Sequence, residues 1–230
     1  MRLHSARRDR RWLAWILAAA AAGLWPAAPV SADSRDASEA TYDVTFQGTW
    51  TDASTPGGVV GSAHFTTLIG AVHNDGVTFW RRGETATPGV ELVAETGETA
   101  RLVSEIEATP HAAAVIRHGI GQGGTSSATF SVEVTDDHPL VTLLSMIGPS
   151  PDWFVGVSSV ALQDAAGRWM SHRVLDLYPY DAGTEDGDDF SLNHPPSIPQ
   201  DVIIGMRGMG RFSEQPMARL TFELREAAGR

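Results

Sequence analysis

Acidic side chains in two short motifs are the groups of this chain best suited to bind a metal ion. The first motif, Pro-Ser-Pro-Asp-Trp, holds Asp152, and the second, Asp-Ala-Gly-Thr-Glu-Asp-Gly, holds Asp181, Glu185 and Asp186. Neither motif contains lysine or arginine, so carboxylates brought together here would repel one another and raise each other's pKa. A divalent cation resolves that repulsion, and Ca²⁺ takes six to eight oxygen ligands from carboxylates, carbonyls and water. The motifs therefore predict a calcium site, with the alternative that Asp152 caps a turn and the other acids face water.

The residues around these acids favour a fixed backbone geometry. Two prolines restrict the chain beside Asp152, and Gly183 and Gly187 allow turn conformations that would strain other residues. Asp181 follows Asp152 by 29 residues, which is enough for one strand, a turn at Asp-Ala-Ala-Gly and a returning strand. We therefore expect an antiparallel hairpin to bring Asp152 and Asp181 to the same end of a sheet.

The elements that must carry these motifs are predicted to be strands. From Tyr42 to Trp50, aromatic and branched residues alternate with polar ones, and a period of two indicates a half-buried strand. Short strands separated by turns rich in glycine, proline and aspartate predict an all-β antiparallel sandwich with very little helix. Further strands are predicted at 77–80, 100–106, 128–134, 139–147, 154–162, 168–177, 202–206 and 218–224, and one short helical turn within 88–98.

The first 32 residues have the layout of a secretory signal peptide. Five arginines precede an apolar run that begins at Trp12, and Val30-Ser31-Ala32 forms a cleavage signal. The run is shorter than the roughly 20 residues that a membrane-spanning helix needs. We expect cleavage near Ala32 and a mature chain that is secreted, periplasmic or on the cell surface, without a transmembrane segment. Residues 33–40 are predicted to be a disordered leader, and 41–228 a single domain.

Charge and composition exclude several classes of function. The whole chain has 17 basic and 28 acidic residues; without residues 1–32 it keeps 12 and 27, a formal charge of −15. Such a surface repels phosphate backbones, which argues against nucleic acid as a partner. The chain has no cysteine, which excludes thiol catalysis and disulfides, and its length allows a stable core without them.

Four segments of the sequence resemble the N-terminal domain of the spondins: 42–50, 64–98, 138–157 and 176–187. The resemblance runs from about Tyr42 to Pro199 and implies an extracellular, C2-like β-sandwich that binds a calcium ion through acidic side chains at one end. Carried over motif by motif, the ligands are Asp152, Asp181 and Glu185. The family has aspartate at the last position, so the neighbouring Asp186 is the alternative. Animal spondins also carry cysteines and thrombospondin-type repeats; this chain has neither, so adhesion through those repeats is not implied.

The leading interpretation is a secreted, calcium-binding module for adhesion or ligand binding, without catalytic activity. Its partner would be an extracellular glycan, a lipid head group or a surface protein. One alternative is a carbohydrate-binding module with structural calcium, in which exposed members of the set Trp80, Trp153 and Trp169 form the binding face, although core packing is expected for most of them. The other is a calcium-dependent hydrolase, which lacks sequence support because no Gly-x-Ser-x-Gly motif is present. His64 and His73 are predicted to make structural hydrogen bonds.

Overall fold

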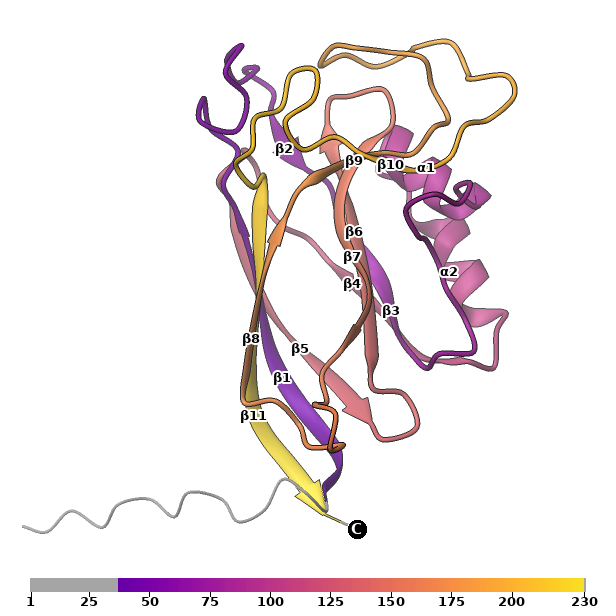
Figure 1. The fold of residues 1–230 in the computed structure, drawn as a ribbon, viewed down its shortest axis with the longest axis vertical. Helices are drawn as coiled ribbons and strands as arrows, with labels where there is room; N and C mark the ends of the chain where they lie inside the picture. The colour runs from indigo at the N-terminus through magenta and orange to yellow at the C-terminus, as the bar shows by residue number, and fades with distance from the viewer. Residues whose placement is uncertain (1–36, 230) are drawn as a thin grey trace, which may run out of the picture. The chain divides into compact units, whose positions relative to one another are not determined.

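The computed structural model describes residues 37–229, which form two antiparallel sheets and a pair of helices (Figure 1). The predicted signal peptide and residues 33–36 of the predicted leader lie outside the described residues. The elements are β1 (Ala37–Gly48), β2 (His64–Phe65), β3 (Leu68–His73), α1 (Pro88–Thr96), α2 (Ala100–Glu107), β4 (Ala112–His118), β5 (Ser127–Thr135), β6 (Leu140–Gly148), β7 (Trp153–Ala161), β8 (His172–Leu177), β9 (Pro179–Asp181), β10 (Ile204–Gly205) and β11 (Ala218–Gly229).

The two sheets pack face to face around the main core, which confirms the predicted all-β antiparallel sandwich. One sheet has four strands in the order β5-β1-β11-β8. The other has seven, in the order β10-β9-β7-β6-β3-β4 with β2 paired to β6. Every strand pairing within these sheets is antiparallel. Tyr42, Phe46 and Phe222 of the first sheet meet Leu143 and Trp153 of the second in one buried cluster.

The two helices add a third layer on the outer face of the seven-stranded sheet, as Figure 1 shows. Val93 of α1 and Leu102 of α2 share a buried cluster with Ile69, Leu144 and Phe154 of the sheet. Because β6 and β7 are covered on both faces, their sequences are apolar almost throughout, as is typical of strands buried on both sides. Neither helix in residues 37–229 has the length and apolarity that a bilayer crossing demands.

The predicted strand at 100–106 is wrong, because these residues form α2. Leu102 and Ile106 fit a strand's period of two, but they are also four residues apart and lie on one face of a helix. Their burial beside an exposed Ser104 follows the helical spacing. The short turn predicted within 88–98 is likewise a full helix, capped by the Thr87 hydroxyl at its start and by left-handed Gly97 at its end.

Other predicted boundaries also change. The predicted leader is wrong for residues 37–40, because β1 already begins at Ala37 and Glu39 pairs with both β11 and β5. Residues 77–80 form no strand; they are a loop in which Phe79 and Trp80 are buried. The long strands predicted at 168–177 and 202–206 shorten to β8 and β10.

The path from Asp152 to Asp181 differs from the predicted hairpin. After β7 the chain crosses to the other sheet, where β8 pairs with β11. It then returns as β9, which pairs with the start of β7 so that Asp181 lies opposite Trp153. The two aspartates therefore do reach the same end of one sheet, through a strand that belongs to the other.

Leu102→Ala should destabilise the domain by about 2–5 kcal/mol, because it leaves a cavity between α2 and the sheet. Glu107→Ala, on the exposed side of the same helix, is the matched control and should change the free energy of unfolding by less than about 0.5 kcal/mol. Urea denaturation of both variants measures the difference. Equal effects of the two substitutions would contradict the assignment of a packed helical layer.

Candidate metal centre

Asp152 lies directly before β7 and is fully buried. Its Oδ2 atom accepts hydrogen bonds from the Thr184 backbone N–H at 2.7 Å, the Thr184 hydroxyl at 3.2 Å and the Glu185 N–H at 3.2 Å. Its Oδ1 atom is buried as well, yet no donor among the described residues reaches it. An unpaired buried carboxylate oxygen is costly, and such atoms are rare in folded proteins.

The turn before Asp152 is fixed by local hydrogen bonds. The buried Ser150 hydroxyl accepts from the Trp153 N–H at 3.1 Å, which closes the Pro-Ser-Pro-Asp segment onto the start of β7. On the other side, the Asp152 carbonyl accepts from the Ala182 N–H at 3.2 Å. Hydrogen bonds from residues of both acidic motifs therefore fix the position of Asp152.

Asp181 ends β9, and both of its carboxylate oxygens have partners. Oδ1 accepts from the Gly183 N–H at 2.8 Å, and Oδ2 accepts from the Trp153 indole N–H at 3.3 Å. Gly183 has a φ of 75°, and a Cβ there would come within 2.7 Å of the Asp201 backbone. Only glycine fits this turn, which carries the chain from Asp181 to the amides that bind Asp152.

Glu185 is brought beside Asp152, whereas the Asp186 carboxylate is engaged elsewhere. The Glu185 amide donates to Asp152, and its side chain is half-buried. Asp186 is exposed, and its Oδ1 accepts from the Ser197 hydroxyl at 2.5 Å. Of the two candidates for the third ligand, Glu185 is therefore the one whose charge lies against the buried carboxylate.

The three carboxylates share a poorly solvated, negative environment. Burial raises the pKa of Asp152, against the hydrogen bonds from Thr184 and Glu185 that lower it. Burial, then the charge of Asp152, raises the pKa of Asp181 to about 6. Burial, then the charges of Glu95 and Asp152, raises the pKa of Glu185 to about 6. The negative charges of these groups repel one another. None of the three forms an ion pair with a basic residue in the described part of the chain.

Sequence reasoning missed Glu95, Thr184 and Asp201, which surround the predicted ligands. Thr184 supplies two of the hydrogen bonds to Asp152, and the charge of Asp201 raises the pKa of Asp181. Glu95, on α1, lines a pocket of about 260 Å³ together with Glu185. Thr184 lies inside the second motif, so the sequence could have singled it out as a hydrogen-bond donor to Asp152 of the first motif. Glu95 and Asp201 carry no local signal, because they arrive through packing.

The donor set fits a hard cation. The candidate side chains offer carboxylate oxygens and no sulfur or imidazole, a choice that suits Ca²⁺ and Mg²⁺ and not zinc. The unpaired Oδ1 of Asp152 supplies a buried oxygen with no other use. Within residues 37–229, no three His, Cys, Asp or Glu side chains stand in an arrangement that could hold a metal ion. Binding would thus require the carboxylates to turn toward a common point.

The histidines and tryptophans have structural positions. His73 is buried; its Nδ1 donates to the Asn74 carbonyl at 2.8 Å and its Nε2 lies 2.8 Å from the Thr142 hydroxyl. His64 Nδ1 donates to the Ser62 carbonyl at 2.8 Å. The expectation of structural hydrogen bonds is confirmed for both. The three candidate tryptophans, Trp80, Trp153 and Trp169, are all buried, which confirms their expected place in the core.

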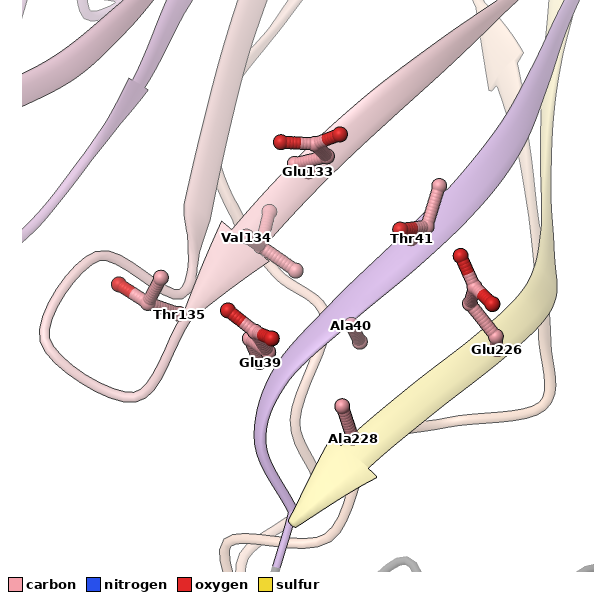
Figure 2. A pocket seen from close by; sticks show the side chains of 8 residues that line it. All are labelled: Glu39, Ala40, Thr41, Glu133, Val134, Thr135, Glu226 and Ala228. Carbon is pink, nitrogen blue, oxygen red and sulfur yellow. The ribbon is translucent and has the colours of Figure 1, made fainter. Parts of the chain in front are cut away.

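A second acidic hollow lies on the four-stranded sheet and differs in kind. Figure 2 shows Glu39 of β1, Glu133 of β5 and Glu226 of β11 around a pocket of about 230 Å³. All three glutamates are exposed. Water can solvate their charges individually, so they lack the buried, unpaired oxygen that marks Asp152.

Comparison with known proteins identifies the family. A family model described as Spondin_N matches residues 40–216. The chain is 39% identical to human spondin-2 over 171 residues, which is 71% of this chain and 51% of that protein. It is 35% identical to rat spondin-2 over 198 residues, covering 82% of this chain and 60% of that protein. It is 34% identical to rat spondin-1 over 174 residues, covering 71% of this chain but 21% of that protein. The chain thus spans about half the length of human spondin-2, and it belongs to the Spondin_N family.

Proposed function

We propose that this domain is a secreted, calcium-binding β-sandwich that serves adhesion or ligand binding and performs no catalysis. The observation that supports it best is the fully buried Asp152, whose Oδ1 has no hydrogen-bond donor within residues 37–229. A calcium ion held by Asp152, Asp181 and Glu185 would use that oxygen and offset the negative charge that raises the pKa of the latter two.

The bound ion would act as a structural staple. Its ligands come from the start of β7, the end of β9 and the loop after it, so one ion would join segments that hydrogen bonds already connect. Segment 195–201 packs on the same loop, since the Ser197 and Asp201 amides donate to the Thr184 and Gly183 carbonyls at 2.9 and 2.8 Å. Calcium would therefore set the shape of the whole loop surface at this end of the sandwich.

The proposed setting outside the cell agrees with the predicted signal peptide and with the spondin relatives. Extracellular calcium sites are often weak, with dissociation constants of about 10⁻⁴–10⁻³ M. Where calcium is plentiful, such a site stays filled and the ion is a permanent part of the fold. The partner would be an extracellular glycan, a lipid head group or a surface protein.

The carbohydrate-binding alternative loses its proposed platform. Trp80, Trp153 and Trp169 are at most 4% exposed. Trp153 and Phe154 point to opposite faces of the sheet, as adjacent strand residues must, but one lies in the main core and the other lies beneath the helices. Neither is available to stack on a sugar ring.

Calcium should raise the melting temperature of the purified protein by about 5–10 °C over EDTA when the ion is near 100 times its dissociation constant. The reason is that the ion binds only the folded form. Asp181→Asn should remove most of this difference, because it removes one ligand charge. Asp137→Asn, an exposed aspartate outside the site, is the matched control and should retain it. Identical melting of the parent protein in calcium and EDTA would refute the metal site.

Without calcium, Glu185→Gln should stabilise the protein at pH 7.5 and leave it unchanged at pH 4. The pKa of Glu185 is raised from 4.5 to about 6 in the folded state. Well below pH 4.5 the carboxyl is protonated in both the folded and the unfolded state and does not affect the free energy of unfolding. As pH rises from 4.5 through 6, the carboxyl ionises more readily in the unfolded state than in the folded state, and stability is lost. We expect a rise in melting temperature of about 2–4 °C at pH 7.5 in EDTA.

The same variant should show the opposite effect in saturating calcium, where Glu185 would be a ligand and its loss would lower the melting temperature. Titrations elsewhere, including that of buried His73, are common to parent and variant and cancel in the difference. A variant that is less stable than the parent in EDTA at pH 7.5 would contradict the raised folded-state pKa.

A further inference from the structure

Glu95 occupies an electrostatically unfavourable position on its own helix. It lies in the last turn of α1, two residues before the left-handed Gly97 that ends the helix. The C-terminal end of a helix carries partial negative charge, so an acidic side chain there is disfavoured and a basic one is preferred. The last turn of α1 has no basic residue. Nothing within the helix explains why a carboxylate stands at this position.

Packing aims the end of α1 at the two acidic motifs. Burial raises the pKa of Glu95, a hydrogen bond from the Thr184 side chain lowers it, and the charges of Glu91 and Asp152 raise it further. The charge of Glu95 is in turn the second largest cause of the raised pKa of Glu185. Glu95 of α1 and Glu185 of the loop line the same pocket, and the Glu185 amide donates to Asp152, so these three residues are neighbours although their carboxylates do not yet point at one spot.

The groups that could neutralise this place from within the protein are few. No ion pair in the described part of the chain involves Glu95, Asp152 or Glu185. The charge of His194 lowers the pKa of Glu185, but its Nε2 also lies 3.3 Å from Asp189 Oδ1. His64 lines the pocket beside Glu95 and Glu185, and its Nδ1 is bonded to Ser62. The buried Oδ1 of Asp152 stands in the same cluster without any partner.

We propose that Glu95 is a further carboxylate ligand of the calcium ion, so that one ion ties α1 to the ends of β7 and β9. This inference rests on the proposed calcium site and names a ligand that neither acidic motif contains. The pocket of about 260 Å³ between Glu95 and Glu185 gives both side chains room to turn toward a shared ion. It is also lined by Thr66, Met146 and Leu192.

The consequence is that calcium would stabilise the helical layer as well as the loops. The acidic motifs alone would fix only strand ends and turns. A ligand on α1 makes the docking of the helix against β6 and β7 depend on the ion. Amide hydrogen exchange in the last turn of α1 should then slow on calcium binding in the parent protein and not in a Glu95 variant.

Glu95→Gln should weaken calcium binding about 10–100-fold, measured by isothermal titration calorimetry of the purified protein with CaCl₂. Glu98→Gln is the matched control: it makes the same charge change three residues further on, at an exposed position, and should change the dissociation constant less than about threefold. Glu95→Gln removes repulsion in the absence of metal, so we expect it to fold. Far-UV circular dichroism checks this, and Glu95→Asp, which keeps the charge but shortens the reach, serves as a second variant that should also bind weakly.

A fall in calcium affinity could come from losing a direct ligand or from losing a charge farther away. Terbium luminescence distinguishes the two. Tb³⁺ substitutes for Ca²⁺, and the Trp153 indole beside Asp181 can sensitise its emission. Decay lifetimes in H₂O and D₂O count the waters on the ion, and Glu95→Gln should add at least one. An unchanged water count overturns the proposal, even where affinity falls. Calcium binding by the parent that Glu95→Gln leaves intact overturns the role of Glu95 but spares the calcium site; a parent that binds no calcium overturns both.

Discussion

The end of the sandwich that carries the two acidic motifs is organised around one carboxylate that water cannot reach. Asp152 is enclosed by the strand it precedes and by the loop after β9, and that loop exists in its present shape because its amides bind the Asp152 oxygen. Only one of the two oxygens is satisfied this way. Moving an ionised carboxylate out of water is expensive unless charge and hydrogen bonds compensate for it. The loop supplies the hydrogen bonds, and the proposed calcium ion would supply the compensating charge.

This arrangement explains why so much of the fold converges on a small region. Asp152 directly precedes β7, the chain then crosses to the opposite sheet as β8, and β9 brings Asp181 back opposite Trp153. Because β8 pairs in the other sheet, the two layers cannot slide past one another without moving the acidic motifs. The helices complete the enclosure from the outer face, with Glu95 at the end of α1. The seven-stranded sheet and the helical layer thus meet at the proposed site, and a single ion bound there would link them.

The half-buried strands and the identity of the acidic motifs could be predicted from the sequence, because both depend on local pattern. The alternation in β1, β5 and β11 reports one buried face directly, and the prolines and glycines around Asp152 and Asp181 mark fixed turns. The errors arose where local pattern is ambiguous or silent. Leu102 and Ile106 satisfy a strand and a helix equally, and only packing on the sheet decides between them. Nothing near β8 in the sequence says which sheet it joins, and Glu95 reaches the site through the docking of a helix that the sequence indicated as a single turn.

The number of carboxylates bears on what the domain could recognise. Asp152, Asp181 and Glu185 already carry more charge than one divalent ion can neutralise, and Glu95 would add to the excess. A site of that composition stays negative after calcium binds, on a chain whose described part is itself strongly acidic. Coulomb repulsion then works against a phosphate or carboxylate reaching the ion. The ion would act by shaping the loops, and the recognition surface would be the apolar and neutral groups those loops present, among them Leu192 and Ile198, which are 50% and 87% exposed. On this reasoning a surface protein, or a neutral glycan, is a better match than an anionic lipid head group.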